Sequence, residues 1–225
     1  MPDHHNQYKR VKIVLFHRIS PKRDLLWDPI DPKLFEQILK YFSKRSTVVG
    51  LDEYFLSPPA KYKKPPVIIT FDDGYKDFIE YGFPILKKYS FSASLFVVTD
   101  CIDKGLPTWT YTLDQLFFYS KKLETKLADI DFLESKYRIK KWATIEERIN
   151  FSKNFKQYLK KIPGKSRNII MKSLQENFDD VNPATGLMLS WDEVRQIQAE
   201  GIHIGSHTVT HSPLATIENE GELEY

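Results

Sequence analysis

Residues 67–74 read Val-Ile-Ile-Thr-Phe-Asp-Asp-Gly, an apolar run that ends in two carboxylates and a glycine. A short run rich in β-branched and aromatic residues, followed by turn residues, predicts a buried β-strand. Similar runs at residues 11–16, 91–98 and 202–206 predict three more strands. A helical pattern from about residue 76 to residue 89 separates two of these runs, and this succession of strand, helix and strand predicts a parallel α/β fold.

Further helices are predicted around and between these strands. Apolar residues at helical spacing predict a helix over residues 32–42. From about residue 112 to residue 180, lysine, glutamate, leucine and phenylalanine recur at helical spacing without a strong strand pattern. We interpret this stretch as a helical insertion within a single domain that spans residues 1–225. Capping boxes predict that two helices begin after Thr144 and Ser190.

The composition is that of a globular protein without a strong charge bias. The chain has 225 residues, a net charge of +3 and a pI of about 8.7, and its basic residues are scattered, so we expect no nucleic-acid partner. Its single cysteine, Cys101, excludes an intrachain disulfide. The polar N-terminus lacks the apolar core of a signal peptide, and the first apolar run, residues 11–16, is too short to cross a membrane. We therefore expect a cytoplasmic protein without a transmembrane segment.

Polar side chains stand at the ends of the predicted strands, where loops converge in parallel α/β folds. They are His17, Asp72, Asp73 and His207. The two adjacent carboxylates should point in different directions, so that one can bind a metal ion while the other takes a proton from water. The spacing of His207 and His211 would let both imidazoles bind that ion. Each pattern alone is weak, because Asp-Asp-Gly turns and His-x-x-x-His spacings also occur in proteins without metal sites.

The two strings together resemble the motifs of the polysaccharide deacetylases, also called the NodB-homology family or family-4 carbohydrate esterases. Thr70–Gly74 matches the family's Thr-Phe-Asp-Asp-Gly motif in full, and His207–His211 matches its His-Ser/Thr-x-x-His motif. Phe16-His17-Arg18 is similar to the Tyr-His-Arg that closes the first strand in many bacterial members. The resemblance implies an α/β fold of the NodB type, a distorted (β/α) barrel.

The resemblance also implies an activity and a role for each matched residue. The activity is metal-dependent hydrolysis of N-acetyl groups on amino sugars of a polysaccharide or lipid-linked glycan, with a carbohydrate as the partner. Asp72 would be the catalytic base. Asp73, His207 and His211 would bind one divalent ion, for which zinc fits best and cobalt, nickel or iron are alternatives. Three further residues are assigned to substrate contact or to support of the site: His17, Tyr75 and Thr208.

The later motifs of this family are not found in the sequence. We identify neither the groove-lining Arg/Tyr-Pro element, nor the Asp/Trp element, nor the Leu-x-His whose histidine is the general acid. We therefore expect a barrel that is incomplete at its C-terminus, and much reduced or no activity of this 225-residue form. The alternative is a truncated, catalytically silent member that only binds metal or sugar, and a two-metal phosphoesterase is a third hypothesis. The sequence identifies neither the sugar nor the oligomeric state.

Overall fold

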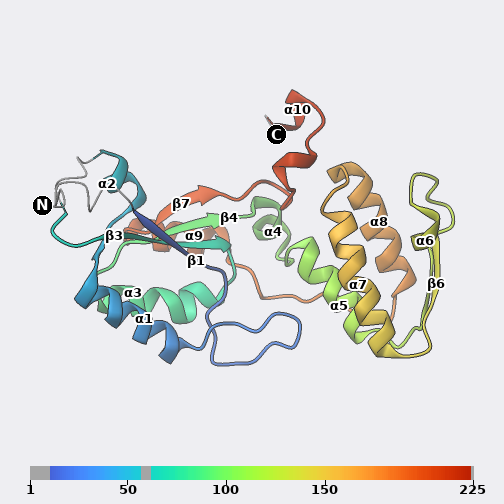
Figure 1. Ribbon diagram of the computed structural model, residues 1–225, viewed down its shortest axis with the longest axis horizontal. Coiled ribbons are helices and arrows are strands. Elements are labelled where there is room, and N and C mark those ends of the chain that lie inside the picture. Colours follow the sequence, from blue (N-terminus) through green and yellow to red (C-terminus); the bar gives the residue numbers. More distant parts are fainter. Residues whose placement is uncertain (1–10, 57–61, 224–225) are drawn as a thin grey trace, which may run out of the picture. The chain divides into compact units, whose positions relative to one another are not determined.

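The computed structural model describes residues 11–56 and 62–223 (Figure 1). The polar N-terminus from which we predicted the lack of a signal peptide lies outside these residues, so the cytoplasmic location stays a prediction. In the described ranges, no helix combines the length and the apolar character needed to cross a bilayer. The chain divides into two compact units, the first made of Met1–Leu106 and Gly186–Thr208 and the second of Pro107–Thr185 and Val209–Tyr225.

A five-stranded parallel β-sheet forms the centre of the first unit. Its main strands lie in the order β1 (Lys12–Phe16), β3 (Pro66–Asp73), β4 (Ser94–Val97) and β7 (His203–Ser206). The two-residue strand β2 (Thr47–Val48) pairs with the start of β3. All of these pairs are parallel, which confirms the predicted α/β class and all four predicted strands.

The register of the strands brings their C-terminal ends to one edge of the sheet. Asp73 of β3 pairs with Val97 of β4, which pairs in turn with Ser206 of β7. His207 therefore leaves the sheet one residue beyond the level of Asp73. On the other side of β3, His17 follows the last paired residue of β1. The sheet thus gathers these polar residues at the edge where parallel α/β folds place their sites, as the strand pattern predicted.

Strand β3 is buried on both faces, which explains its nearly continuous apolar sequence. On one face it shares a core with three helices, α1 (Pro32–Arg45), α3 (Phe83–Lys88) and α9 (Trp191–Ala199). Figure 1 shows α1 and α3 side by side along the sheet. Ile68 faces the other way and packs with Val49 and Tyr62. Two short helices that the sequence did not predict complete this unit, α2 (Leu51–Leu56) and α4 (Thr99–Lys104).

The single helix predicted over residues 76–89 is divided in the structure. A turn of π-helix, η3 (Phe78–Gly82), comes first, and α3 then begins with Pro84 at its second position. Proline lacks an amide hydrogen, so it is tolerated in the first turn of a helix but disrupts the interior. The division therefore lies where the proline can be accommodated.

The second unit is mainly helical, as we predicted for residues 112–180. Its helices are α5 (Trp109–Tyr119), α6 (Ser135–Arg138), α7 (Ile145–Leu159), α8 (Gly164–Asn177) and α10 (Glu220–Leu223), with a 3-10 turn, η4, at Leu214–Thr216. Two three-residue strands, β5 (Glu124–Lys126) and β6 (Ile139–Lys141), form an antiparallel pair that was not predicted. Strands this short show no measurable period in the sequence.

The two predicted capping boxes differ in the structure. Ser190 and Glu193 form a complete box at the start of α9, with both reciprocal hydrogen bonds present. At the start of α7, the Thr144 hydroxyl accepts a hydrogen bond from the Glu147 amide at 3.2 Å. The Glu147 carboxylate, however, accepts its bond from the amide of Ala143, one residue before the cap. Both residues still satisfy amides at a helix start, which is the physical purpose of the motif.

Candidate metal centre

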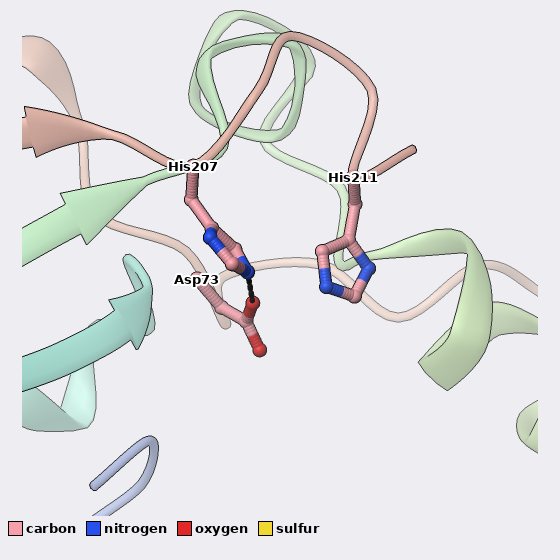
Figure 2. Close-up of side chains that lie close together, drawn as sticks. All are labelled: Asp73, His207 and His211. Atoms are coloured by element: carbon pink, nitrogen blue, oxygen red, sulfur yellow. Dashed lines mark ion pairs between the residues drawn. The ribbon is translucent and has the colours of Figure 1, made fainter. Parts of the chain in front are cut away.

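Asp73, His207 and His211 point toward one another (Figure 2). Each offers one ligand atom, and these atoms all lie within 4.8 Å of one another. The Nε2 atom of His207 lies 3.6 Å from Oδ1 of Asp73. One carboxylate oxygen and two imidazole nitrogens form a donor set that suits zinc and related divalent ions. The structure therefore brings together the three residues for which the resemblance implied metal binding.

Strained backbone conformations gather at these residues. Asp73, Thr208 and His211 have positive φ angles of 74°, 65° and 56°, and Ser90 is the one other non-glycine residue of this kind among the described residues. Left-handed conformations are unfavourable for residues with a Cβ atom, and they persist only where surrounding contacts maintain them. Such residues concentrate at functional sites, so their clustering supports a functional role for this loop and strand end.

The environment of Asp73 favours a bound cation. Asp73 is 1% exposed, and burial together with the neighbouring charge of Asp72 raises its pKa to about 7. A buried carboxylate is costly to ionise unless a positive charge lies beside it. A divalent ion between Asp73 and the two imidazoles would supply that charge, so the residues present fit a metal.

Asp72 differs from its neighbour because it is only half-buried. Its charge acts on two other groups of the site, since it raises the pKa of Asp73 and opposes the lowering of the pKa of His17. Burial is the main cause of the lowered pKa of His17, and the charge of His207 adds to it. Asp72 is thus a solvent-accessible carboxylate whose charge acts on both His17 and Asp73.

The three residues assigned to substrate contact or to support of the site, His17, Tyr75 and Thr208, make different contacts. Tyr75 is 1% exposed, and its ring lies against Trp27 at 5.6 Å between centroids, so support of the site fits it better than substrate contact. Trp27 also contacts the ring of His17, at 5.0 Å. The carbonyl oxygen of Thr208 accepts a hydrogen bond from the amide of Thr99, at 3.4 Å. Thr208 therefore ties the histidine loop to the start of α4.

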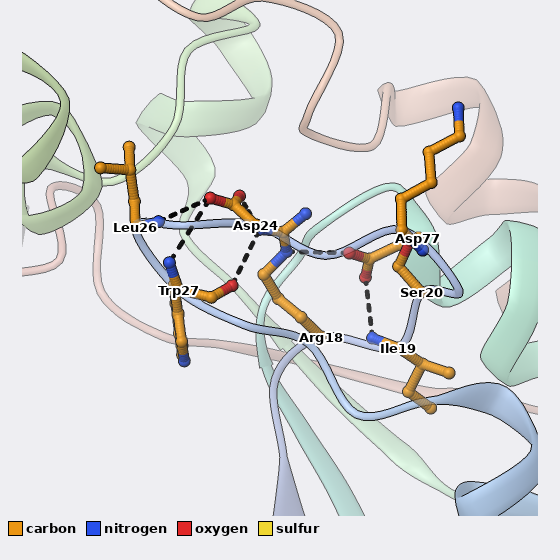
Figure 3. A network of polar contacts seen from close by, with 8 residues as sticks. Arg18, Ile19, Ser20, Asp24, Leu26, Trp27 and Asp77 are labelled. Carbon is orange, nitrogen blue, oxygen red and sulfur yellow. Dashed lines mark hydrogen bonds and ion pairs between the residues drawn. The ribbon is translucent and has the colours of Figure 1, made fainter. Parts of the chain in front are cut away.

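A buried ion network holds the segment that follows His17 (Figure 3). Arg18 donates from Nε to Asp77 Oδ2 at 2.8 Å and from Nη1 to Asp24 Oδ2 at 2.6 Å. The second oxygen of Asp77 accepts the amide of Ile19 at 3.2 Å. The guanidinium also lies over the Tyr75 ring, 5.0 Å from its centroid. This network was not predicted from the sequence, because Arg18 and Asp77 are 59 residues apart.

We expect Arg18→Lys to lower the free energy of unfolding by about 2 kcal/mol, because an ammonium group cannot reproduce two directed bonds to separate carboxylates. Urea unfolding at neutral pH would measure the loss. Arg23→Lys is the matched control, since Arg23 is 85% exposed at the side chain and pairs with Asp28 on the surface. Equal stability of the two variants would show that the buried network does not depend on the guanidinium.

The chain is similar to known proteins along much of its length. Residues 60–225 match the family model described as "Polysaccharide deacetylase". YxkH of Bacillus subtilis (strain 168), whose name assigns it to polysaccharide deacetylases, is 30% identical over 92 residues, which are 40% of this chain and 32% of YxkH.

Two solved structures are similar as well. The Streptococcus pyogenes deacetylase PplD, in complex with acetate, is 30% identical, with a TM-score of 0.35 over 42% of this chain and 45% of PplD. BC0361, a polysaccharide deacetylase from Bacillus cereus, is 16% identical, with a TM-score of 0.49 over 95% of this chain and 45% of BC0361. The matched part is thus less than half the length of YxkH, PplD or BC0361.

Proposed function

This chain belongs to the polysaccharide deacetylase family, and we propose that it is a metal-dependent hydrolase that removes N-acetyl groups from amino sugars of a polysaccharide or lipid-linked glycan. Membership confirms the resemblance that the motifs indicated and the NodB-type fold class that it implied. The observation that supports the proposal most strongly is the approach of Asp73, His207 and His211, with a second carboxylate, Asp72, directly beside them.

Asp73, His207 and His211 would hold one divalent ion, and zinc suits this donor set best, with cobalt, nickel or iron as alternatives. When bound, such an ion polarises an acyl carbonyl and makes water a better nucleophile near neutral pH. The positive charge would also keep Asp73 ionised in its buried position. The metal dependence of the activity rests on this donor set.

Asp72 would act as the general base, because it is accessible and lies next to the ligand Asp73. Its carboxylate would accept the proton of the attacking water as the oxygen bonds to the acetyl carbon. His17, whose pKa is lowered, would stay neutral at pH 7 and could accept or donate a hydrogen bond at the same strand edge. Trp27 and the buried Tyr75 would keep the His17 ring in place.

We also propose that residues 1–225 act as one deacetylase domain, with the helical stretch as an insertion. The family model extends over the helical stretch and both sides of it, because it covers residues 60–225. The substrate class follows from the family, so a carbohydrate that carries N-acetyl groups is the proposed partner.

The test is metal binding followed by acetate release. The protein is freed of metal, loaded separately with zinc, cobalt, nickel or iron(II), and incubated with oligomers of N-acetylglucosamine. We expect one ion per chain and acetate release that depends on it. Binding of an ion without acetate release would favour the silent, metal-binding alternative. Two ions per chain would favour the phosphoesterase, and no binding of any of the four ions would overturn the proposal.

A further inference from the structure

In the second, mainly helical unit (the helical unit), two arginines are fully buried, and their guanidinium groups make different contacts. Arg148 donates to the carbonyl oxygens of Phe117, Lys122 and Phe118, at and beyond the end of α5, which is a structural use of a guanidinium. Arg167, near the start of α8, donates a hydrogen bond from Nη2 to the Ser212 hydroxyl. Its Nε and Nη1 atoms have no hydrogen-bond partner among the described residues.

Arg167 stacks on a tryptophan that contacts the histidine loop. The guanidinium carbon lies 4.8 Å from the centroid of the Trp109 ring. The indole nitrogen of Trp109 donates a hydrogen bond of 2.9 Å to the carbonyl oxygen of His211, 102 residues further along the chain. The face of the indole is therefore covered by Arg167 while its edge binds the main chain of the second histidine.

A second hydrogen bond, from Arg167, reaches Ser212, the residue that follows His211 in the same loop. The Ser212 hydroxyl, which accepts from Arg167, also shares a hydrogen bond of 2.8 Å with the hydroxyl of Thr210. Gly164, the first residue of α8, allows this approach, because a Cβ atom there would lie 3.2 Å from the Ser212 oxygen. Ser212, and Thr210 through it, are therefore linked to the pair formed by the buried Arg167 and the half-buried Trp109.

We propose that Trp109 and Arg167 are positioning residues that fix the conformation of the loop from Val209 to Ser212 and so hold His211 ready to bind the metal ion. The inference rests on the proposed role of His211 as a ligand. Helices α5 and α8 would thus contribute to the metal site by supporting the backbone of one ligand rather than by supplying a ligand side chain of their own.

The backbone of His211 explains why such support is needed. Its φ of 56° is a left-handed conformation, which costs free energy for a residue other than glycine and relaxes if its contacts are lost. A hydrogen bond to the carbonyl of His211 opposes rotation of the peptide that follows it. Residues that orient a metal ligand commonly change metal affinity 10- to 100-fold when they are replaced, and the same logic applies to a brace on the main chain.

Trp109→Phe tests the inference, because it removes the indole N–H and leaves an aromatic ring under Arg167. The matched control is Trp142→Phe, which removes the same atoms from a tryptophan in the core of the same unit, where it packs against Phe117 and Phe151. Cobalt is titrated into each metal-free variant and followed by its visible absorption. We expect the Kd for cobalt to rise about 10-fold in Trp109→Phe and to stay unchanged in Trp142→Phe.

Hydrogen exchange of the metal-free protein gives a readout that does not depend on metal binding. The amides of residues 209–212 should exchange faster in Trp109→Phe than in the wild type or in Trp142→Phe, whereas the amides of α5 should be unaffected. Ser212→Ala, which removes the acceptor of Arg167, should change exchange and affinity in the same direction, and it replaces Trp109→Phe if that variant does not fold.

The outcomes separate the two proposals. Equal exchange and equal cobalt affinity in Trp109→Phe and Trp142→Phe would overturn the positioning role, whatever the wild type does with substrate. A wild type that binds no cobalt would contradict the proposed function, and the amide exchange of residues 209–212 would still decide whether Trp109 fixes the loop.

Discussion

Replacing Asp72 with asparagine should lower the rate of acetate release by about 10²- to 10⁴-fold, the usual contribution of a general base, while the protein still binds its metal ion. An amide cannot accept the proton of the attacking water, but it fills nearly the same volume. Asp72 is half-buried and is not one of the three residues whose ligand atoms gather within 4.8 Å, so metal affinity should change little.

The measurement pairs acetate release with metal content for each variant. Asp129→Asn is the control, because Asp129 is an exposed carboxylate in the helical unit and lies outside the proposed site. We expect it to match the wild type in both readouts. If Asp72→Asn kept full turnover, the base would be another group, and His17 would be the next candidate. If it lost the metal ion, Asp72 would be a ligand instead.

The strand ends explain why so much of the site could be predicted. Apolar runs ending in Asp72-Asp73 and before His207 give both the strand and the polar residue at its end. In a parallel sheet these ends must share an edge, so their proximity follows once the strands are correctly identified. The register confirms this for β3, β4 and β7, where Asp73, Val97 and Ser206 lie at one level.

What the sequence did not predict depends on contacts between distant residues. The bond from Trp109 to His211 joins residues 102 positions apart, and the one from Arg167 to Ser212 joins residues 45 apart. Contacts between residues so far apart in the sequence leave no helical or strand periodicity from which they could be predicted. The positive φ of His211 could not be predicted either, because local propensity disfavours it and tertiary contacts hold it in place.

We expect metal-free Asp73→Asn to be more stable than the metal-free wild type, and zinc-loaded Asp73→Asn to be less stable than the zinc-loaded wild type. In the unfolded chain an aspartate ionises near its ordinary pKa of 3.8, whereas burial and the charge of Asp72 raise the pKa of Asp73 to about 7 in the folded state. The folded protein therefore holds a proton that the unfolded chain releases, and the stability of the metal-free protein falls as the pH rises from about 4 to about 7. Asparagine cannot ionise, so it removes this loss.

At pH 8 we expect metal-free Asp73→Asn to be more stable than the wild type by about 2–4 kcal/mol, since each unit of pKa shift corresponds to about 1.4 kcal/mol. The difference should shrink toward pH 4. Urea unfolding in the presence of a chelator, at several pH values, would measure it, with Asp129→Asn, at an exposed position, as the control.

Adding zinc should make the wild type more stable than Asp73→Asn. An ion at about 10,000 times its Kd stabilises the folded wild type by about 5.5 kcal/mol, which exceeds the metal-free difference of about 2–4 kcal/mol, whereas Asp73→Asn lacks the anionic ligand and should gain little. The wild type would thus become the more stable protein on loading. If the variant were more stable with and without zinc by the same amount, Asp73 would not be a ligand. If the wild type were more stable in both states, the carboxylate would be ionised and stabilised by groups of the chain itself, and its environment would not require a cation.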